Sequence, residues 1–217
     1  MATYLFDFDG TLVDSMPTYC AMVKKVLEDE HIPYGPDLMK IVTPLGFAGT
    51  ADYMIERLGL PLPREEILCR MQDFAGTAYA TTIPAKEDVP EVLRALSARG
   101  DRLNILTASP HANLDPCLKR LGLWELFDHV WSCEDFGTGK SDPAIYRAAA
   151  ERMGVPVESV IFLDDNLNAD LTAKSVGMQV YGVYDDSSAE YVDQIKAATD
   201  RYITRFSELL VESEGTV

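Results

Sequence analysis

FDFDGTLVDS, residues 6–15, introduces two acidic side chains directly behind an apolar run that begins at Thr3. We predict a buried strand from Thr3 to Phe8, because this run is apolar and rich in aromatic residues. In such a strand Asp7 and Asp9 lie on one face, roughly 6–7 Å apart. Two carboxylates this close at the end of an apolar strand repel each other and resist desolvation, and a hard divalent cation relieves both problems. The alternative for an isolated D-x-D pattern is an acidic turn without a ligand. The choice between this turn and a cation site depends on the residues in the rest of the chain.

The composition is that of an ordinary globular chain with an acidic balance. The 217 residues are enough for one large domain or two smaller ones. A net charge of -16 argues against a nucleic-acid or anionic-membrane partner. No run of about 18 apolar residues predicts a membrane span. The four cysteines are widely spread and form no C-x-x-C pair, which indicates reduced thiols and a cytoplasmic location.

The segment after the first strand shows helical spacing and no convincing strand up to Pro84. Its apolar pattern predicts helices over residues 16–31, 36–42, 50–58 and 64–80. About 70 residues are too many for a simple connection within an α/β unit. We therefore predict that residues 16–84 form a small helical cap domain, inserted into a core domain built from residues 1–15 and 85–217.

From Val89 the pattern alternates between helices and short apolar strands. We predict strands over residues 103–106, 130–132, 160–163, 180–183 and 202–204, with helices over 89–99, 112–121, 142–153, 167–176, 190–198 and 206–210. This alternation predicts an α/β fold with a doubly wound, mostly parallel sheet that carries helices on both faces. Residues 212–217 are expected to form a loose tail.

The ends of the predicted strands collect groups that suit one task. In an open parallel sheet, ligands bind at the carboxyl ends of the strands. Thr107-Ala108-Ser109 offers hydroxyl and N–H groups before a helix, either as an anion site or as an ordinary N-cap. Lys140 lies just before Asp142, which we assign as a helix N-cap, and the pair Asp164-Asp165 ends another buried strand. Acids can hold Mg²⁺, hydroxyls and a lysine can hold a phosphoryl group, and an Asp facing phosphorus is a possible nucleophile.

Four segments together resemble the motifs of the haloacid dehalogenase superfamily, in the same order along the chain. They read D-F-D-G-T-L-V-D-S at 7–15, T-A-S at 107–109, G-K-S-D-P at 139–143 and F-L-D-D-N at 162–166. The resemblance covers nearly the whole chain and implies a Rossmann-like core with a helical cap. The subgroup that it resembles most contains phosphoglycolate phosphatases and β-phosphoglucomutases.

The resemblance implies catalytic and phosphate-binding roles at matching positions. Asp7 would be the nucleophile, and Asp9 would donate a proton to the leaving oxygen and then take one from water. Thr107 would hold the phosphoryl group with the amides of Asp9 and Ala108. Lys140 would offset the charge of the nucleophile and the phosphate.

The resemblance also implies a Mg²⁺ site. Asp7, the backbone carbonyl of Asp9 and Asp165, together with Asp164, would hold the ion. The motif departs from many relatives at Ala169, where a further Asp or Asn is common, so the contribution of its neighbour Asp170 stays open.

The expected activity is Mg²⁺-dependent hydrolysis of a small phosphomonoester through an aspartyl-phosphate. A sugar phosphomutase of the same fold is the alternative, but residues 43–50, the candidate cap loop, contain no basic residue to grip a second phosphate. A phospho-acceptor signalling domain is a weaker alternative, because such domains need no cap. The substrate class stays open between phosphoglycolate, a sugar phosphate and a nucleoside monophosphate, and so does the oligomeric state. Lys86 and His111 are candidates for the pocket rim.

Overall fold

The computed structural model describes residues 1–211, with only the backbone of Pro44, and the expected tail, residues 212–217, lies outside the described residues. The chain divides into two compact units. One is built from Met1–Asp14 and Pro84–Val217, and the other from Ser15–Ile83. The larger unit is α/β and the smaller is helical, so each is described by itself below.

The smaller unit consists of helices. They are α1 (Met16–Asp29), α2 (Leu38–Val42), the 3₁₀ turn η1 (Thr43–Leu45), α3 (Gly46–Glu56) and α4 (Arg64–Thr81). Its core forms where α1 and α4 meet, because both helices bury one apolar stripe, including Val23 and Val26 on α1 and Ile67 and Met71 on α4. The prediction of a loop over residues 43–50 is wrong, because this stretch forms η1 and the start of α3.

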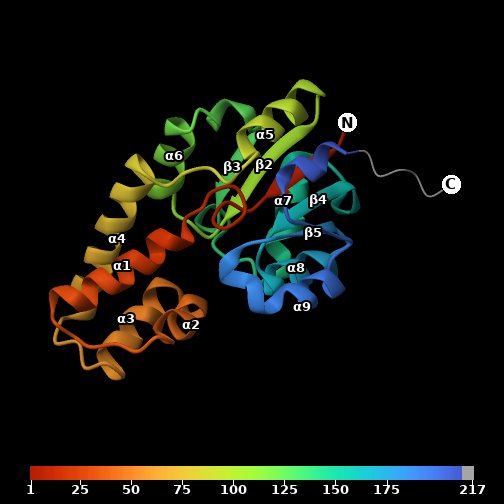
Figure 1. The fold of residues 1–217 in the computed structure, drawn as a ribbon. Helices are drawn as coiled ribbons and strands as arrows, with labels where there is room; N and C mark the ends of the chain where they lie inside the picture. The colour runs from red at the N-terminus through yellow and green to blue at the C-terminus, as the bar shows by residue number, and fades with distance from the viewer. Residues whose placement is uncertain (212–217) are drawn as a thin grey trace. The chain divides into compact units, whose positions relative to one another are not determined.

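The larger unit is organised around a six-stranded parallel sheet (Figure 1). Its strands are β1 (Thr3–Phe6), β2 (Arg102–Thr107), β3 (His129–Ser132), β4 (Val160–Asp164), β5 (Gln179–Val183) and β6 (Arg201–Ile203). The spatial order β3-β2-β1-β4-β5-β6 reverses direction between β1 and β4. The predicted doubly wound parallel sheet is confirmed, and the reversal marks the place where such sheets bind ligands.

Helices connect the strands of this sheet. They are α5 (Val89–Ala98), α6 (His111–Arg120), α7 (Pro143–Met153), α8 (Leu167–Ser175) and α9 (Val192–Ala198). The 3₁₀ segments are η2 (Trp124–Leu126), η3 (Cys133–Phe136), η4 (Val157–Ser159), η5 (Asp186–Tyr191) and η6 (Phe206–Leu210). The predicted helices are confirmed apart from their ends, but residues 206–210 form a 3₁₀ segment instead of an α-helix.

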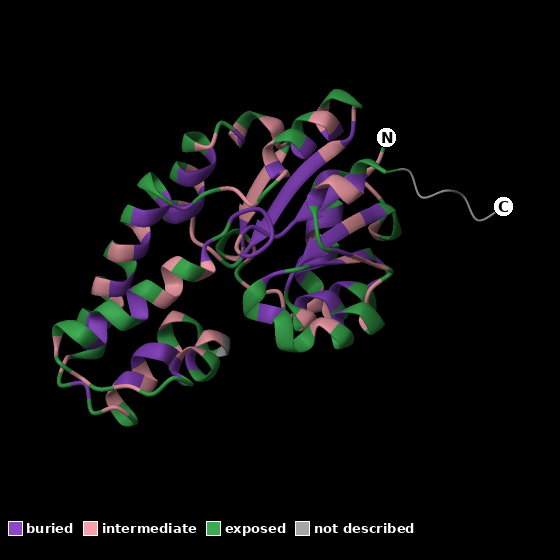
Figure 2. Ribbon diagram, viewed as in Figure 1, coloured by how far each residue is buried: buried purple, intermediate pink, exposed green. Residues whose placement is uncertain are grey.

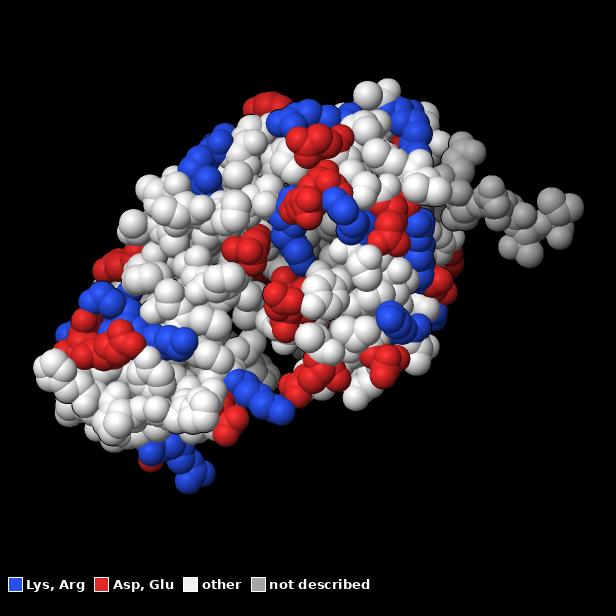
Figure 3. All heavy atoms as spheres, viewed as in Figure 1, with Lys and Arg blue, Asp and Glu red and all other residues white. Residues whose placement is uncertain are grey.

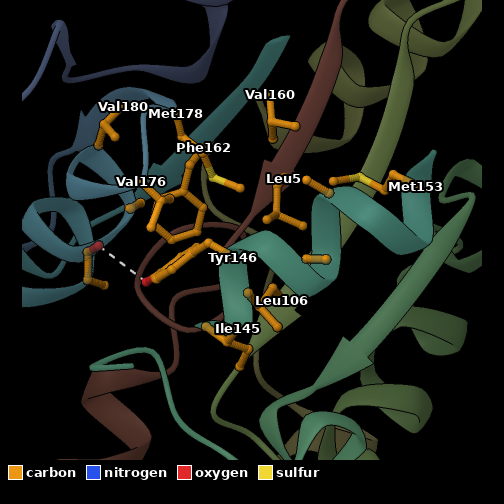
Figure 4. Close-up of a cluster of buried hydrophobic side chains, with 14 residues drawn as sticks. Leu5, Leu106, Ile145, Tyr146, Met153, Val160, Phe162, Val176, Met178 and Val180 are labelled. Carbon is orange, nitrogen blue, oxygen red and sulfur yellow. Dashed lines mark hydrogen bonds between the residues drawn. The ribbon is translucent and has the colours of Figure 1, made fainter. Parts of the chain in front are cut away.

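The two faces of the sheet have separate cores, as the period of two in a strand requires. On one face Leu5 lies in a cluster with Tyr146 of α7 and Phe162 of β4, and the Tyr146 and Phe162 rings meet edge to face (Figure 4). On the other face the ring of Phe6 packs against Phe206 and other aromatic rings. The central strands β1, β2 and β4 are accordingly buried along most of their length, whereas the edge strands β3 and β6 are mostly half-buried (Figure 2).

The surface reflects the acidic composition. On the face shown in Figure 3, lysines and arginines are scattered among acidic side chains and form no continuous basic area among the residues drawn in colour. Within residues 1–211, no helix combines the length and apolar composition that a membrane crossing requires.

Candidate active site

Three buried carboxylates meet at the carboxyl ends of β1 and β4, where the strand order reverses. Asp7 follows β1 directly, and its N–H donates to the carbonyl of Leu163 (2.8 Å), which extends the ladder by one residue. Asp164 is the last residue of β4 and Asp165 follows it. One oxygen from each of the three carboxylates lies within 4.8 Å of the other two. The sheet topology therefore brings together acids that are more than 150 positions apart in the sequence.

Asp9 takes a different place from the one that the sequence predicts. β1 ends at Phe6, so the prediction of a strand through Phe8 is wrong, and Asp7 and Asp9 do not share a strand face. The chain turns instead, because the N–H groups of Leu12 and Val13 both donate to the carbonyl of Phe8. The Asp9 carboxylate accepts a hydrogen bond from the Ser109 hydroxyl, with 2.5 Å between the oxygens. The side chain of Asp9 is thus bound to the loop between β2 and α6.

Lys140 bridges two of the three acids. Its ammonium donates to Asp7 Oδ1 and to Asp164 Oδ2 (2.8 Å to the latter). The segment that carries Lys140 is fixed by its own contacts: Tyr146 donates to the Lys140 carbonyl (3.1 Å). Asp142 caps α7 by accepting from the N–H of Ala144 (2.9 Å), which confirms its predicted role as N-cap. Contacts with the start of helix α7 therefore fix the segment that carries the Lys140 ammonium.

Burial and mutual repulsion govern the protonation of these groups. Burial raises the pKa of Asp7 to about 7, with the charge of Asp164 adding to the rise and Lys140 opposing it. Burial also raises the pKa of Asp165 well above its usual range, and the charges of Asp164 and Asp7 raise it further. For Lys140, burial lowers the pKa, but the charges of Asp164 and Asp7 outweigh burial and raise it well above its usual value. The lysine stays charged, yet one ammonium does not neutralise three carboxylates.

A fourth acid, Asp170, interacts electrostatically with this cluster. Asp170 on α8 is fully buried, and neither carboxylate oxygen has a hydrogen-bond partner among the described residues. Burial raises its pKa to about 9, and the charges of Asp164 and Asp165 contribute. A hard divalent cation prefers carboxylate oxygens as ligands and would lower the free energy of this cluster. The donor set of Asp7, Asp164 and Asp165 therefore fits such an ion.

The predicted phosphate-binding residues lie at the end of the neighbouring strand. Thr107 is the buried last residue of β2, and its hydroxyl accepts the N–H of Ser109 (3.0 Å). Ala108 is exposed in the turn that follows. Helix α6 begins only after Pro110 and has no side-chain N-cap, so neither hydroxyl serves as the cap of this helix. The N-cap alternative for Thr107 and Ser109 is thereby excluded.

The loop after Asp9 packs directly on Asp165, which sequence reasoning missed. Thr11 donates to Asp165 Oδ1 (3.2 Å). Gly10 has a φ of +77° and lies so close that a Cβ on it would be 2.6 Å from Asp165 Oδ2. Only a glycine combines this backbone conformation with this approach. The signal in the sequence was the Gly-Thr pair itself, but nothing local identifies a partner 154 positions away.

The two candidates for the pocket rim are occupied by other contacts. His111 lies between Asp115 and Asp135, at 2.8 and 2.9 Å from its ring nitrogens, and hydrogen bonds to these carboxylates raise the pKa of the imidazole. The ammonium of Lys86 donates to the Gly10 carbonyl, to the Tyr184 carbonyl and to Asp185. Both side chains are therefore tied to protein groups.

Several known proteins are similar to this chain in sequence. A family model described as haloacid dehalogenase-like hydrolase matches residues 1–177. The phosphorylated carbohydrates phosphatase of Thermotoga maritima is 27% identical over 184 residues, which cover 84% of this chain and 85% of the relative. The phosphoglycolate phosphatase of Escherichia coli is 28% identical over 214 residues, covering 87% and 83% of the two chains.

Solved structures show the same fold. A crystal structure described as a predicted phosphoglycolate phosphatase from Haemophilus somnus superposes with a TM-score of 0.81 at 21% identity, covering 97% of this chain and 96% of the other. The structure of CbbY from Rhodobacter sphaeroides in complex with phosphate gives a TM-score of 0.79 at 21% identity, covering 96% of both chains. Because the family model spans most of the sequence and the predicted motifs fall within it, this chain belongs to the haloacid dehalogenase-like hydrolases.

Proposed function

We propose that this protein is a Mg²⁺-dependent phosphatase that hydrolyses a small phosphomonoester through an aspartyl-phosphate on Asp7. The observation that carries the proposal is the position of Asp7: its carboxylate is buried, paired with Lys140 and adjacent to Asp164 and Asp165. Such a group is held in one orientation and kept away from bulk water, as a nucleophile requires.

The three clustered carboxylates are the proposed metal ligands. Asp7, Asp164 and Asp165 would hold Mg²⁺ through oxygen, together with the backbone carbonyl of Asp9. When bound, the ion would offset the charge of the carboxylates and of the phosphoryl oxygens. In this arrangement Lys140 supplies the second positive charge, and its contacts to Asp7 and Asp164 keep it at the reacting group.

The first half of the reaction transfers the phosphoryl group to the protein. A carboxylate oxygen of Asp7 attacks phosphorus, a P–O bond to Asp7 forms and the bond to the leaving oxygen breaks. Asp9 gives its proton to that oxygen, so that an alcohol leaves. The hydroxyl of Thr107 and the amides of Asp9 and Ala108 would hold the non-bridging oxygens during the transfer.

The second half restores the enzyme. Asp9, now ionised, takes a proton from a water molecule, and the resulting hydroxide oxygen attacks phosphorus. The P–O bond to Asp7 breaks, and inorganic phosphate leaves. Ser109 holds the Asp9 carboxylate through its hydroxyl, and this contact orients the group that exchanges the proton in both halves.

A small phosphorylated metabolite is the proposed substrate. The relatives named above are phosphatases of phosphorylated carbohydrates and of phosphoglycolate, which supports a compact phosphomonoester and does not choose between these two. A panel of sugar phosphates, phosphoglycolate and nucleoside monophosphates, assayed for released phosphate, is the direct test.

The panel should be run with Mg²⁺, with EDTA and with two variants. We expect phosphate release with Mg²⁺ and none with EDTA. We also expect none from Asp7→Asn, whose circular dichroism spectrum should match that of wild type and show that the variant is folded. Asp128→Asn removes an exposed carboxylate paired with Arg102 and serves as the matched control with unchanged activity. Activity that persists in EDTA or in Asp7→Asn would contradict the proposal, and turnover that requires an added sugar bisphosphate would show a mutase.

A further inference from the structure

Lys86 joins two segments near the proposed metal site. Its ammonium donates to the Gly10 carbonyl (2.6 Å), the Tyr184 carbonyl (2.6 Å) and Asp185 Oδ2 (3.0 Å). Gly10 belongs to the loop after β1, whereas Tyr184 and Asp185 follow β5. An ammonium group has three donors, and all three are used here. The Lys86 ammonium therefore has no donor left for a substrate phosphate in this structure.

The partners of Lys86 are themselves fixed. Asp185 is buried, and its second oxygen accepts from the N–H (2.9 Å) and the hydroxyl (2.6 Å) of Ser187. The backbone N–H of Lys86 donates to the carbonyl of Leu12 (3.0 Å). Both the main chain and the side chain of Lys86 thus bind the loop formed by residues 10–12, while Asp185 anchors the ammonium to the carboxyl edge of the sheet.

This loop is the one that contacts the acid of the neighbouring strand. Gly10 lies against the Asp165 carboxylate, and Thr11 donates to Asp165 Oδ1. Asp9 immediately precedes the loop. The Gly10 carbonyl that Lys86 holds therefore lies in the loop that connects two proposed metal-binding groups, the Asp9 carbonyl and, through Thr11, the Asp165 carboxylate.

We infer that Lys86 is a positioning residue, which fixes the loop of residues 10–12 against Asp165 and thereby sets the geometry in which the acids receive a divalent cation. The inference rests on the proposed function only for the identity of the ion, because the contacts that define it lie within the protein. It assigns to Lys86 a role through Gly10 and Thr11 and no contact with substrate.

The test compares Lys86→Met with Lys174→Met. The first variant keeps the aliphatic stem and removes the ammonium, and the second removes an ammonium from an exposed ion pair with Asp200. Loss of an outer partner of metal ligands typically weakens metal binding by about 10–100-fold, and since Lys86 acts through Gly10 and Thr11 we expect about 10-fold. Mg²⁺ affinity is measured by calorimetry well below the unfolding temperature of each variant.

A second measurement needs neither metal nor substrate. In the metal-free protein, hydrogen exchange at the amides of Gly10 and Val13 reports the order of the loop, because these amides donate to Val13 and Phe8 carbonyls. We expect at least about 10-fold faster exchange in Lys86→Met, with unchanged exchange in helix α7, and no change in Lys174→Met. If Lys86→Met does not fold, Lys86→Arg is used, since its planar guanidinium keeps the charge but cannot direct donors at three converging acceptors.

The outcomes separate this inference from the proposed function. Unchanged loop exchange together with unchanged Mg²⁺ affinity in the folded Lys86 variant would overturn it. A general loss of stability without a change in either readout would assign Lys86 a purely structural role and would also overturn it. A wild-type protein that binds Mg²⁺ but releases no phosphate from any phosphomonoester would contradict the proposed function, while the Lys86 comparison would still stand on binding and exchange.

Discussion

The hydroxyl of Ser109 donates a hydrogen bond to the carboxylate of Asp9. The bond of 2.5 Å joins a side chain after β2 to one after β1, and it is a hydrogen bond to a group that carries charge during part of the proposed cycle. Such bonds contribute about 1.5–3 kcal/mol. We therefore predict that Ser109→Ala lowers kcat by roughly 10–100-fold and changes KM much less.

Steady-state kinetics on the best substrate of the panel measures this prediction. Ser175→Ala, at the exposed end of α8, is the matched control and should behave as wild type. A Ser109→Ala enzyme with wild-type kcat would show that the hydroxyl does not orient the acid.

Asp170 makes the stability of the metal-free protein depend on pH. Its pKa is raised to about 9 in the folded state by burial and by nearby acids, whereas an unfolded Asp releases its proton near pH 4. The folded protein keeps this proton between these two values and the unfolded chain does not. The stabilising contribution is therefore complete below about pH 4 and is lost as the pH rises towards 9.

Asp170→Asn removes this titration, because an amide stays neutral. We predict that the variant is more stable than wild type at pH 8, by on the order of 2–5 kcal/mol, and that the difference shrinks towards pH 5. Urea unfolding in EDTA at the two pH values measures it, with the exposed Asp193→Asn as control. A difference that is equal at both values would refute the assignment of a buried, protonated Asp170.

At the scale of elements, β5 depends on a glycine that lets a helix approach. A Cβ on Gly182 would fall on the Cγ2 atom of Ile195 in α9 and lie 3.0 Å from the ring of Tyr202 in β6. Overpacking of this kind typically costs about 1–3 kcal/mol. We predict that Gly182→Ala lowers the free energy of unfolding by that amount, measured by urea denaturation.

The control for this substitution is Gly139→Ala, where a Cβ would meet nothing within 4 Å. It should leave the free energy of unfolding within about 0.5 kcal/mol of wild type. Equal stability of the two variants would contradict the close packing of α9 on β5 at Gly182.

Helices and strands with a strong apolar period could be predicted from the sequence. The strand over residues 160–163 and the apolar stripe around Val23 could be predicted from the local sequence. A short continuous apolar run is typical of a strand buried on both faces, and helical spacing of apolar residues is typical of a helix buried on one face. The ends of helices and strands could not be predicted from local sequence alone. β1 stops at Phe6 because the turn from Phe8 to Val13 closes through backbone bonds, and no residue before Gly10 signals it. The helical character of residues 43–50 was hidden by a Pro and two Gly in the same stretch.

At the scale of the whole molecule, the site depends on which strands are neighbours. The sequence predicts a parallel sheet but not its order, because alternation of helices and strands fits several orders. Asp7, Lys140 and Asp164 could be singled out from their places after strands and from the family resemblance. The partners Ser109–Asp9, Thr11–Asp165 and Lys86–Gly10 could not, since each joins side chains or carbonyls 76 or more positions apart through tertiary packing.

The proposed catalysis depends on Asp7, which accepts the phosphoryl group while the other acids hold a cation. Rapid quenching of the enzyme during turnover of its best phosphomonoester with Mg²⁺, followed by borohydride reduction and peptide mass spectrometry, locates a phosphorylated carboxylate. We predict reduction at Asp7 alone, absent in EDTA and absent in Asp7→Asn. Full turnover with modification at another residue, or with none at Asp7 under any quench time, would contradict the account.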